Sequence, residues 1–219
     1  PLLAGHRQFR STKASQKCWI ISLTGATLPY GRLRQLKKPL ALGSKHSREI
    51  AQLTDQKIAS SAEVLANVLA RQRNGGRSVV MCHGVFDPIH PGHILHLQAA
   101  RDLGDILVVS ITADRYVNKG PWRPVFSERL RAQTLASIGV VDHVVINDSP
   151  TATDLIRTLR PNIYVKGSDY ENDSQDLTGQ ISVEAEAVKE IGGRIEFTHE
   201  ETHSSSSLIN RHFSTYPTE

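Results

Sequence analysis

Beyond residue 57 the chain alternates between short, continuous apolar runs and longer segments whose apolar residues recur at helical spacing. Each apolar run has the length of a buried strand and ends at a glycine or a polar turn. We therefore expect five strands, at residues 77–84 (RSVVMCHG), 105–112 (DILVVSIT), 141–147 (VDHVVIN), 162–167 (NIYVKG) and 194–199 (RIEFTH).

The segments between these runs read as helices, because helical apolar spacing coincides with start and stop signals. Ser60 and Glu63 have the spacing of a capping box, and Ser127 suits an N-cap. Pro91 suits a first helical turn, and Gly104 suits a helix stop. Helices are expected within residues 60–76, 91–104, 127–139, 151–160, 181–193 and 204–213.

Strict alternation of strand and helix, with strands that are apolar throughout, predicts an α/β fold. The expected architecture is a Rossmann-like, doubly wound, five-stranded parallel sheet with helices on both faces. Ligands of such sheets bind in the crevice beyond the carboxyl ends of the strands. The loops that follow the strands are therefore where functional residues are expected.

Charge divides the chain into two parts. Residues 1–48 hold ten Lys or Arg and no Asp or Glu, which leaves sixteen basic against twenty-two acidic residues in the remainder. We interpret residues 1–56 as a basic N-terminal extension of unknown role and residues 57–219 as the functional domain. The extension has the composition of a transit peptide, whereas CWIISLTGATLPYG within it favours a short strand and turn.

Composition restricts the expected binding partners and the cellular compartment. An acidic folded body argues against nucleic acid, which needs a concentrated basic face. No apolar run reaches the roughly 20 residues of a membrane span, so a membrane partner is not expected either. Cys18 and Cys82 lack the spacing of a metal motif, and we expect a reduced, cytoplasmic setting.

The loop after the first of these strands carries an unusual set of residues. GVFDPIHPGH, residues 84–93, places two histidines three residues apart where a strand gives way to a helix. A helix N-terminus offers free N–H groups and positive potential to an anion. Gly84 and Gly92 permit close approach of the backbone to a ligand, and His90 and His93 add hydrogen-bond donors. This chemistry suits a phosphate group.

GVFDPIHPGH resembles the GxFDxxHxGH signature of the cytidylyltransferase-like nucleotidyltransferases. Residues 118–145, 161–170 and 192–209 are similar to successive blocks of the bacterial heptose-phosphate nucleotidyltransferases, and most similar to modules carried beside a ribokinase-like sugar kinase. The resemblance covers residues 57–219. It differs at His83, where Asn is usual, at Val85, where Cys is usual, and at His203 and Trp122.

The resemblance implies a role for each matching residue. His90, His93 and Lys166 would be catalytic, contacting the triphosphate and neutralising charge on it. Lys119, Arg123 and Arg129 would bind the acceptor phosphate, although Arg129 alternatively holds its loop through Glu128. Asp87 would either bind Mg²⁺, which arrives with the nucleotide, or fix the loop by accepting backbone N–H bonds. The remaining nucleotide-binding residues would be Gly84, Val85, Phe86, Asp87, Gly92, Gly167, Asp169, Ser204, Ser205 and Ser206.

The expected enzyme is a nucleotidyltransferase that joins a sugar 1-phosphate, such as heptose 1-phosphate, to a nucleoside monophosphate from ATP or CTP and releases pyrophosphate. One alternative is a CTP-dependent cytidylyltransferase acting on glycerol 3-phosphate or phosphoethanolamine. Another is a non-catalytic, nucleotide-binding regulatory module. The protein partners that this interpretation admits are a second copy in a homodimer and a kinase domain in a longer parent chain.

Overall fold

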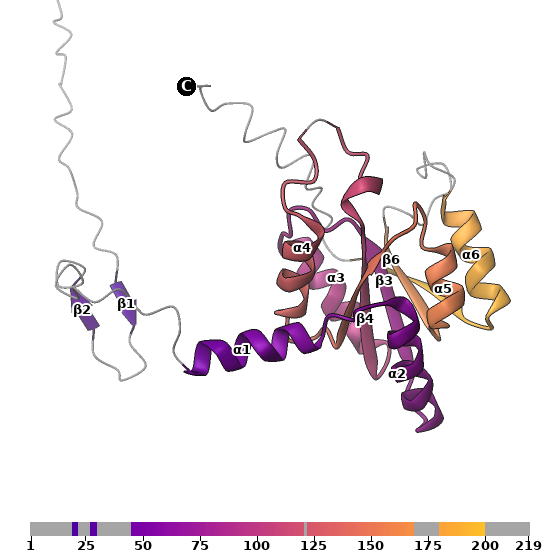
Figure 1. The fold of residues 1–219 in the computed structure, drawn as a ribbon, viewed down its shortest axis with the longest axis horizontal. Helices are drawn as coiled ribbons and strands as arrows, with labels where there is room; N and C mark the ends of the chain where they lie inside the picture. Colours follow the sequence, from indigo (N-terminus) through magenta and orange to yellow (C-terminus); the bar gives the residue numbers. More distant parts are fainter. Residues whose placement is uncertain (1–18, 22–26, 30–44, 121, 169–179, 200–219) are drawn as a thin grey trace, which may run out of the picture. The chain divides into compact units, whose positions relative to one another are not determined.

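The computed structural model describes residues 19–21, 27–29, 45–120, 122–168 and 180–199 (Figure 1). The chain divides into two compact units, Pro1–Ser47 and Arg48–Glu219. In the first unit β1 (Trp19–Ile21) pairs antiparallel with β2 (Thr27–Pro29). These two strands lie in the segment for which a strand and turn were expected. The division falls N-terminal to the predicted boundary after residue 56, which coincides with the end of a helix.

The second unit contains a five-stranded, fully parallel sheet in the order β5-β4-β3-β6-β7. The predicted fold class is confirmed. β3 lies at the centre, and the chain runs outward through β4 and β5 before crossing to β6 and β7 on the other side. The strands are β3 (Val79–Gly84), β4 (Ile106–Thr112), β5 (His143–Asn147), β6 (Ile163–Gly167) and β7 (Arg194–Thr198).

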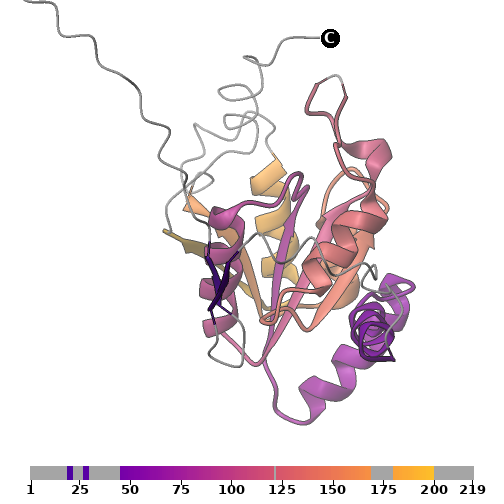
Figure 2. The same cartoon turned by 90° about the vertical axis from the view of Figure 1, so that its left-hand side faces the viewer.

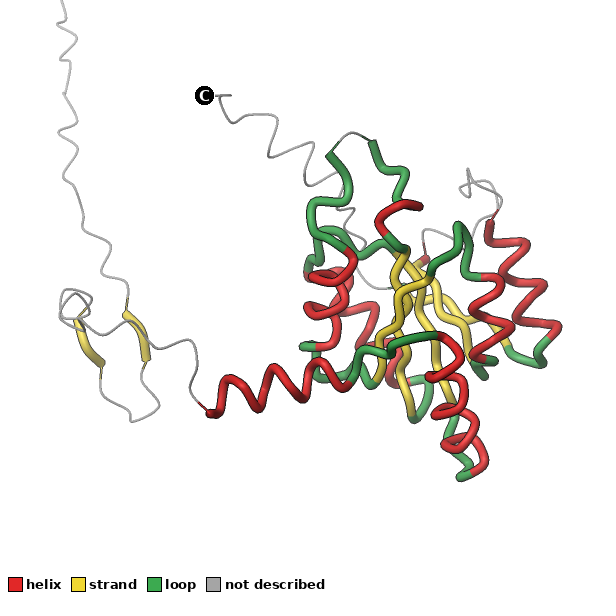
Figure 3. Tube along the Cα trace, in the orientation of Figure 1, coloured by secondary structure: helices red, strands yellow, loops and turns green. Residues whose placement is uncertain are grey.

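Helices cover both faces of this sheet, as the tube of Figure 3 and the turned view of Figure 2 show. One core joins α3 and α4 to the sheet through residues such as Leu97 and Leu135, and the other joins α2, α5 and α6 through residues such as Leu69 and Ile156. The helices are α1 (Lys45–Gln56), α2 (Ala62–Asn74), α3 (Pro91–Asp102), α4 (Glu128–Ala136), α5 (Thr153–Leu159) and α6 (Gln180–Glu190).

The described helices depart from the expected ones at two places. α1 was not predicted, and the N-cap of α2 is Ser61 rather than Ser60: the Ser61 side chain accepts a hydrogen bond from the backbone N–H of Val64. The closing helix expected at residues 204–213 lies outside the described residues. None of the helices in the described part of the chain is long and apolar enough to span a membrane.

Candidate nucleotide-binding site

The loop that carries the two histidines follows the central strand of the sheet. β3 is flanked by β4 on one side and β6 on the other, and the direction of chain progression reverses between β3 and β6. In open parallel sheets such a reversal opens a crevice at the carboxyl ends of the strands, where ligands bind. Gly84 ends β3 and Gly167 ends β6, so both glycines lie at this edge.

His90 and His93 lie at the start of α3 with their rings stacked. His90 is the N-cap of the helix, and the ring centroids are 3.8 Å apart with an interplanar angle of 30°. The backbone N–H of His90 donates to Nδ1 of His93 at 3.3 Å. Because a backbone N–H only donates, Nδ1 of His93 is an acceptor, and the neutral ring carries its proton on Nε2. His93 therefore presents a fixed N–H donor.

Burial keeps the His93 ring neutral. Burial first, and then the charges of His90, His96 and Lys119, lower the pKa of His93 to about 3. The edge of the Phe86 ring packs against the imidazole with centroids 5.2 Å apart. A neutral N–H donor at a helix N-terminus stabilises an anion without first having to take up a proton. Gly92, in the same turn, is buried, as the close approach of backbone requires.

Asp87 is buried and fixes two loops to each other. Its carboxylate accepts hydrogen bonds from the backbone N–H groups of Val125 (2.7 Å) and Phe126 (3.0 Å), and from Nε of Arg123 (3.0 Å). Of the two roles considered for Asp87, loop fixing is the one for which the structure supplies partners. The Arg123 side chain, which is predicted to bind the acceptor phosphate, is 8% exposed and also donates to the carbonyl of Asp87.

Arg131 completes this junction, and it was not predicted as a site residue. The side chain is 1% exposed and donates to the carbonyls of Val85 (2.6 Å), Thr112 (2.8 Å) and Phe126 (3.0 Å). It also pairs with Asp114 at 2.7 Å. One guanidinium thus joins the loop after β3, the end of β4 and the segment before α4. On a helix surface an arginine normally indicates a solvated face, so its burial could not be predicted.

Lys166 occupies the end of β6 and is also largely buried. Its ammonium lies 2.8 Å from the carboxylate of Glu184 on α6, and 5.4 Å from the centroid of the Tyr164 ring. The Lys166 charge contributes to lowering the pKa of His83 on β3 and of His96 on α3 to about 4, after burial, which is the larger cause in both. The ammonium therefore lies close to the crevice between β3 and β6.

His83 and His96 line the same region, and neither was predicted as a site residue. Nδ1 of His83 lies 2.7 Å from Oγ of Ser110, which in turn donates to the Cys82 carbonyl at 3.4 Å. Nδ1 of His96 lies 2.6 Å from Oγ1 of Thr198 at the end of β7. His83 is one of the four positions at which the sequence departs from the family that it resembles.

For the other predicted residues the structure gives fewer contacts, or none because they lie outside the described residues. Lys119 and Arg129 are exposed, and the influence of the Lys119 charge on His93 places it near the histidine turn. Glu128 accepts a hydrogen bond from the backbone N–H of Asp114 at 2.8 Å. Trp122 is 94% exposed. Asp169, Ser204, Ser205 and Ser206, together with His203, lie outside the described residues.

A protein-bound metal is not supported by the donors in the described residues. They contain no group of three or more His, Cys, Asp or Glu side chains that could hold an ion. Both carboxylate oxygens of Asp87 already accept hydrogen bonds from Arg123 and the backbone. We therefore derive no step through a metal held by these residues.

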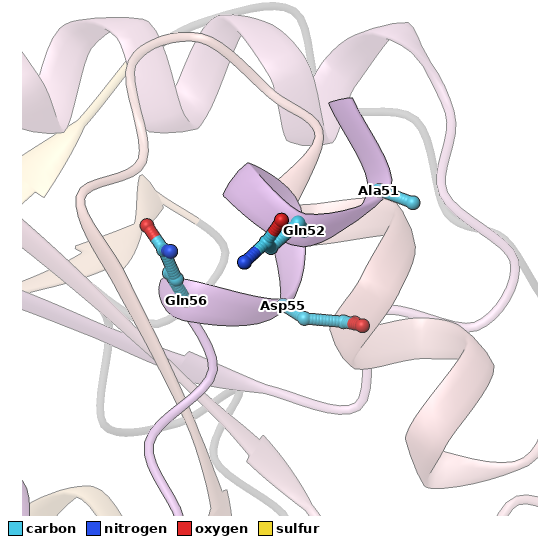
Figure 4. A pocket seen from close by; sticks show the side chains of 4 residues that line it. All are labelled: Ala51, Gln52, Asp55 and Gln56. Carbon is cyan, nitrogen blue, oxygen red and sulfur yellow. The ribbon is translucent and has the colours of Figure 1, made fainter. Parts of the chain in front are cut away.

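A hollow elsewhere shares no residue with this site. It is lined by four α1 residues, Ala51, Gln52, Asp55 and Gln56 (Figure 4). They supply two amides and one carboxylate but none of the cationic side chains that would hold phosphate. The candidate site is therefore placed by the strand ends and the histidine turn.

The fold and the histidine turn define an α/β domain of the nucleotidyltransferase class. The chain belongs to the cytidylyltransferase-like family, which matches residues 81–211. The family predicted from the sequence is thereby confirmed.

The chain is also similar to curated proteins. The chain is 41% identical over 152 residues to the bifunctional protein HldE of Syntrophotalea carbinolica, covering 68% of this chain and 30% of the relative. For the HldE of Citrifermentans bemidjiense the identity is 40% over 166 residues, covering 74% and 32%. For that of Campylobacter curvus it is 37% over 194 residues, covering 88% and 37%. The chain thus spans about a third of the length of these relatives.

Proposed function

We propose that this domain transfers a nucleoside monophosphate from ATP or CTP to a sugar 1-phosphate of the heptose 1-phosphate kind, with release of pyrophosphate. The observation that carries the proposal is the stacked His90–His93 pair at the N-terminus of α3, where a neutral, oriented N–H donor meets the free amides of a helix. Support for the acceptor comes from the similarity of the later blocks to heptose-phosphate nucleotidyltransferases.

The reaction requires alignment and charge stabilisation rather than a general base. A phosphate oxygen of the acceptor attacks the α-phosphorus, a new P–O bond forms, and the bond from the α-phosphorus to the oxygen bridging it to the β-phosphorus breaks. The electron pair leaves on pyrophosphate. The acceptor phosphate is already largely ionised near neutral pH, since its second pKa is about 6. No proton has to be abstracted before the attack.

The residues around the histidine turn and at the end of β6 divide the work of this step. Nε2–H of His93, the His90 side chain and the first N–H groups of α3 stabilise charge on the α-phosphate. Lys166 neutralises phosphate oxygens from the end of β6 as a point charge. Asp87, Arg123 and Arg131 hold the loops around the turn, which preorganises the donors. Mg²⁺ would enter bound to the nucleotide, and Lys119 would meet the acceptor phosphate.

A second enzyme reading, a cytidylyltransferase for glycerol 3-phosphate or phosphoethanolamine, differs only in the acceptor. The KGSDY segment at residues 166–170 favours the sugar-phosphate branch over it. A kinase domain in a longer parent chain would supply the phosphorylated sugar, in keeping with the word "bifunctional" in the relatives' name.

The test is pyrophosphate release from a matrix of ATP, CTP, GTP and UTP against heptose 1-phosphate, other sugar 1-phosphates, glycerol 3-phosphate and phosphoethanolamine. We expect turnover with a sugar 1-phosphate and with ATP or CTP. Turnover restricted to glycerol 3-phosphate or phosphoethanolamine would overturn the acceptor assignment. Binding of triphosphate without turnover across the matrix would support the regulatory module and overturn the enzyme.

A further inference from the structure

Glu184 is a buried carboxylate that the reaction above does not use. It lies on α6, is 1% exposed and makes three contacts. Its Oε2 lies 2.8 Å from Nζ of Lys166 and accepts a hydrogen bond from the hydroxyl of Tyr164 at 2.9 Å. Its Oε1 accepts a hydrogen bond from the backbone N–H of Ala152 at 3.4 Å, just before α5. A carboxylate in such surroundings is stable only while these partners are present.

The Lys166–Glu184 ion pair lies close to the crevice at the carboxyl ends of the strands. Tyr164 and Lys166 lie two residues apart on β6 and therefore face the same side of the sheet, and the lysine is the last side chain before the glycine that ends the strand. The Tyr164 ring is fully buried, and the ammonium lies beside it. The Lys166 charge is felt by His83 on the neighbouring strand and by His96 on α3. The ammonium is thus held between α6 and the histidine-lined edge of β3.

A free lysine side chain has four methylene groups and many rotamers, so its charge is poorly positioned unless something holds it. Here the lysine is 11% exposed and its partner carboxylate 2%. The partner is itself fixed from two further directions, by Tyr164 and by Ala152. These contacts favour one position of the ammonium, at the carboxyl end of β6.

We propose that Glu184 is the positioning residue for Lys166, holding its ammonium at the crevice edge so that it meets the phosphates of the bound nucleotide. This inference rests on the proposed function and adds to it a residue from α6. Glu184 touches no substrate. Its effect reaches the reaction only through Lys166.

Two conservative variants separate geometry from charge. Glu184→Gln keeps an acceptor at the same distance from the backbone and removes the charge, whereas Glu184→Asp keeps the charge and withdraws it by one methylene. A displacement of about 1 Å at a reacting centre costs on the order of a hundredfold in rate. We expect kcat/KM for the nucleotide to fall about a hundredfold in Glu184→Asp and less than about tenfold in Glu184→Gln. The reverse order would overturn the positioning role.

Coupling to Lys166 provides the second readout. In Lys166→Met and in the double variant Lys166→Met/Glu184→Asp we expect the same kcat/KM, since both changes act through one ammonium. If the two losses multiply instead, Glu184 acts by another route and the proposal fails. A purely structural role would lower the melting temperature of Glu184→Asp and leave kcat/KM per folded molecule unchanged, which would also overturn it.

The same helix offers a matched control. Glu190 also forms an ion pair, with Nε of Arg157 at 2.8 Å, but it is exposed and is the last residue of α6. Glu190→Gln should leave kcat/KM unchanged.

Binding of inorganic pyrophosphate, measured by calorimetry, separates this proposal from the proposed function. If wild type shows no turnover but pyrophosphate binding weakens equally in Glu184→Asp, Lys166→Met and the double variant, the positioning role stands and the reaction fails. Unchanged pyrophosphate binding in Lys166→Met and Glu184→Asp, together with unchanged turnover, would overturn the role.

Discussion

Lowering the pH from 7 to 5 should destabilise this domain through histidines that are neutral in the fold. The pKa values of His83, His93 and His96 fall to about 4, about 3 and about 4, mainly because the rings are buried. The ordinary value, expected in the unfolded chain, is about 6.5. Between these limits the unfolded state binds more protons, so stability is fully present above about pH 6.5 and is lost as the pH falls toward 4.

The magnitude follows from the same values. At pH 5 a histidine that stays neutral in the fold and has a pKa of about 6.5 when unfolded costs about 2 kcal/mol. Three such residues together should lower the free energy of unfolding by about 4–6 kcal/mol, a large part of the 5–15 kcal/mol typical of a domain. Paired carboxylates lose their contribution mostly below this range, so they do not obscure the effect.

Urea denaturation followed by circular dichroism at pH 7 and pH 5 measures this difference. His83→Asn removes one of the three titrating rings and should reduce the difference by about 2 kcal/mol. An unfolding free energy that is the same at both pH values would refute the reasoning. So would three imidazole signals that titrate near pH 6.5 in the folded protein, because the folded and unfolded states would then take up the same protons between pH 7 and pH 5.

Three further predictions concern the loops, the packing and the histidines. Arg131→Met should lower the free energy of unfolding by about 3–5 kcal/mol, because three backbone carbonyls and Asp114 lose a buried partner. A decrease of less than about 1 kcal/mol in urea denaturation would contradict this. Gly104→Ala places a Cβ 2.7 Å from Cγ2 of Val80 and should lower the free energy of unfolding by about 1–3 kcal/mol. As a control, Gly139→Ala, whose Cβ would have no atom within 4 Å, should change that free energy by less than about 0.5 kcal/mol. Equal effects of the two variants on the melting temperature would show the packing argument to be wrong. His90→Ala and His93→Ala should each lower kcat about a hundredfold in the pyrophosphate assay, and near-normal turnover would remove them from the reaction.

The sheet was readily predicted because buried parallel strands are continuous apolar runs whose limits a turn residue marks. All five strands of the sheet lie within the expected segments. The ends of the helices could not be read as well from the sequence. Ser60 and Ser61 are adjacent, and only the structure shows that Ser61 caps α2. In α1 only Ile50, Ala51 and Leu53 are apolar, and the segment was assigned to the N-terminal extension, which is why the helix was not expected.

Only the part of the site that is contiguous in the sequence was predicted. The histidine turn is contiguous in the sequence, so its spacing carries the signal. Arg131 and Glu184 are charged residues on helices, and such residues usually face solvent. Their burial depends on contacts with segments distant in the sequence: Arg131 reaches Val85, 46 residues away, and Tyr164 reaches Glu184 across 20. Arg123 stays a predicted ligand of the acceptor phosphate because it lies in the loop expected to fold over it, and its ion pair with Asp87 is visible only in the structure.

The fate of the acceptor's phosphate oxygens tests the central claim most directly. A sugar 1-phosphate whose phosphate oxygens carry a heavy isotope, incubated with the preferred triphosphate, separates attack by phosphate from hydrolysis when the products are weighed by mass spectrometry. Attack on the α-phosphorus predicts that every labelled oxygen remains in the nucleotide sugar and that the pyrophosphate is unlabelled. Label released as inorganic phosphate, or a nucleoside monophosphate formed without transfer to the sugar phosphate, would contradict the account.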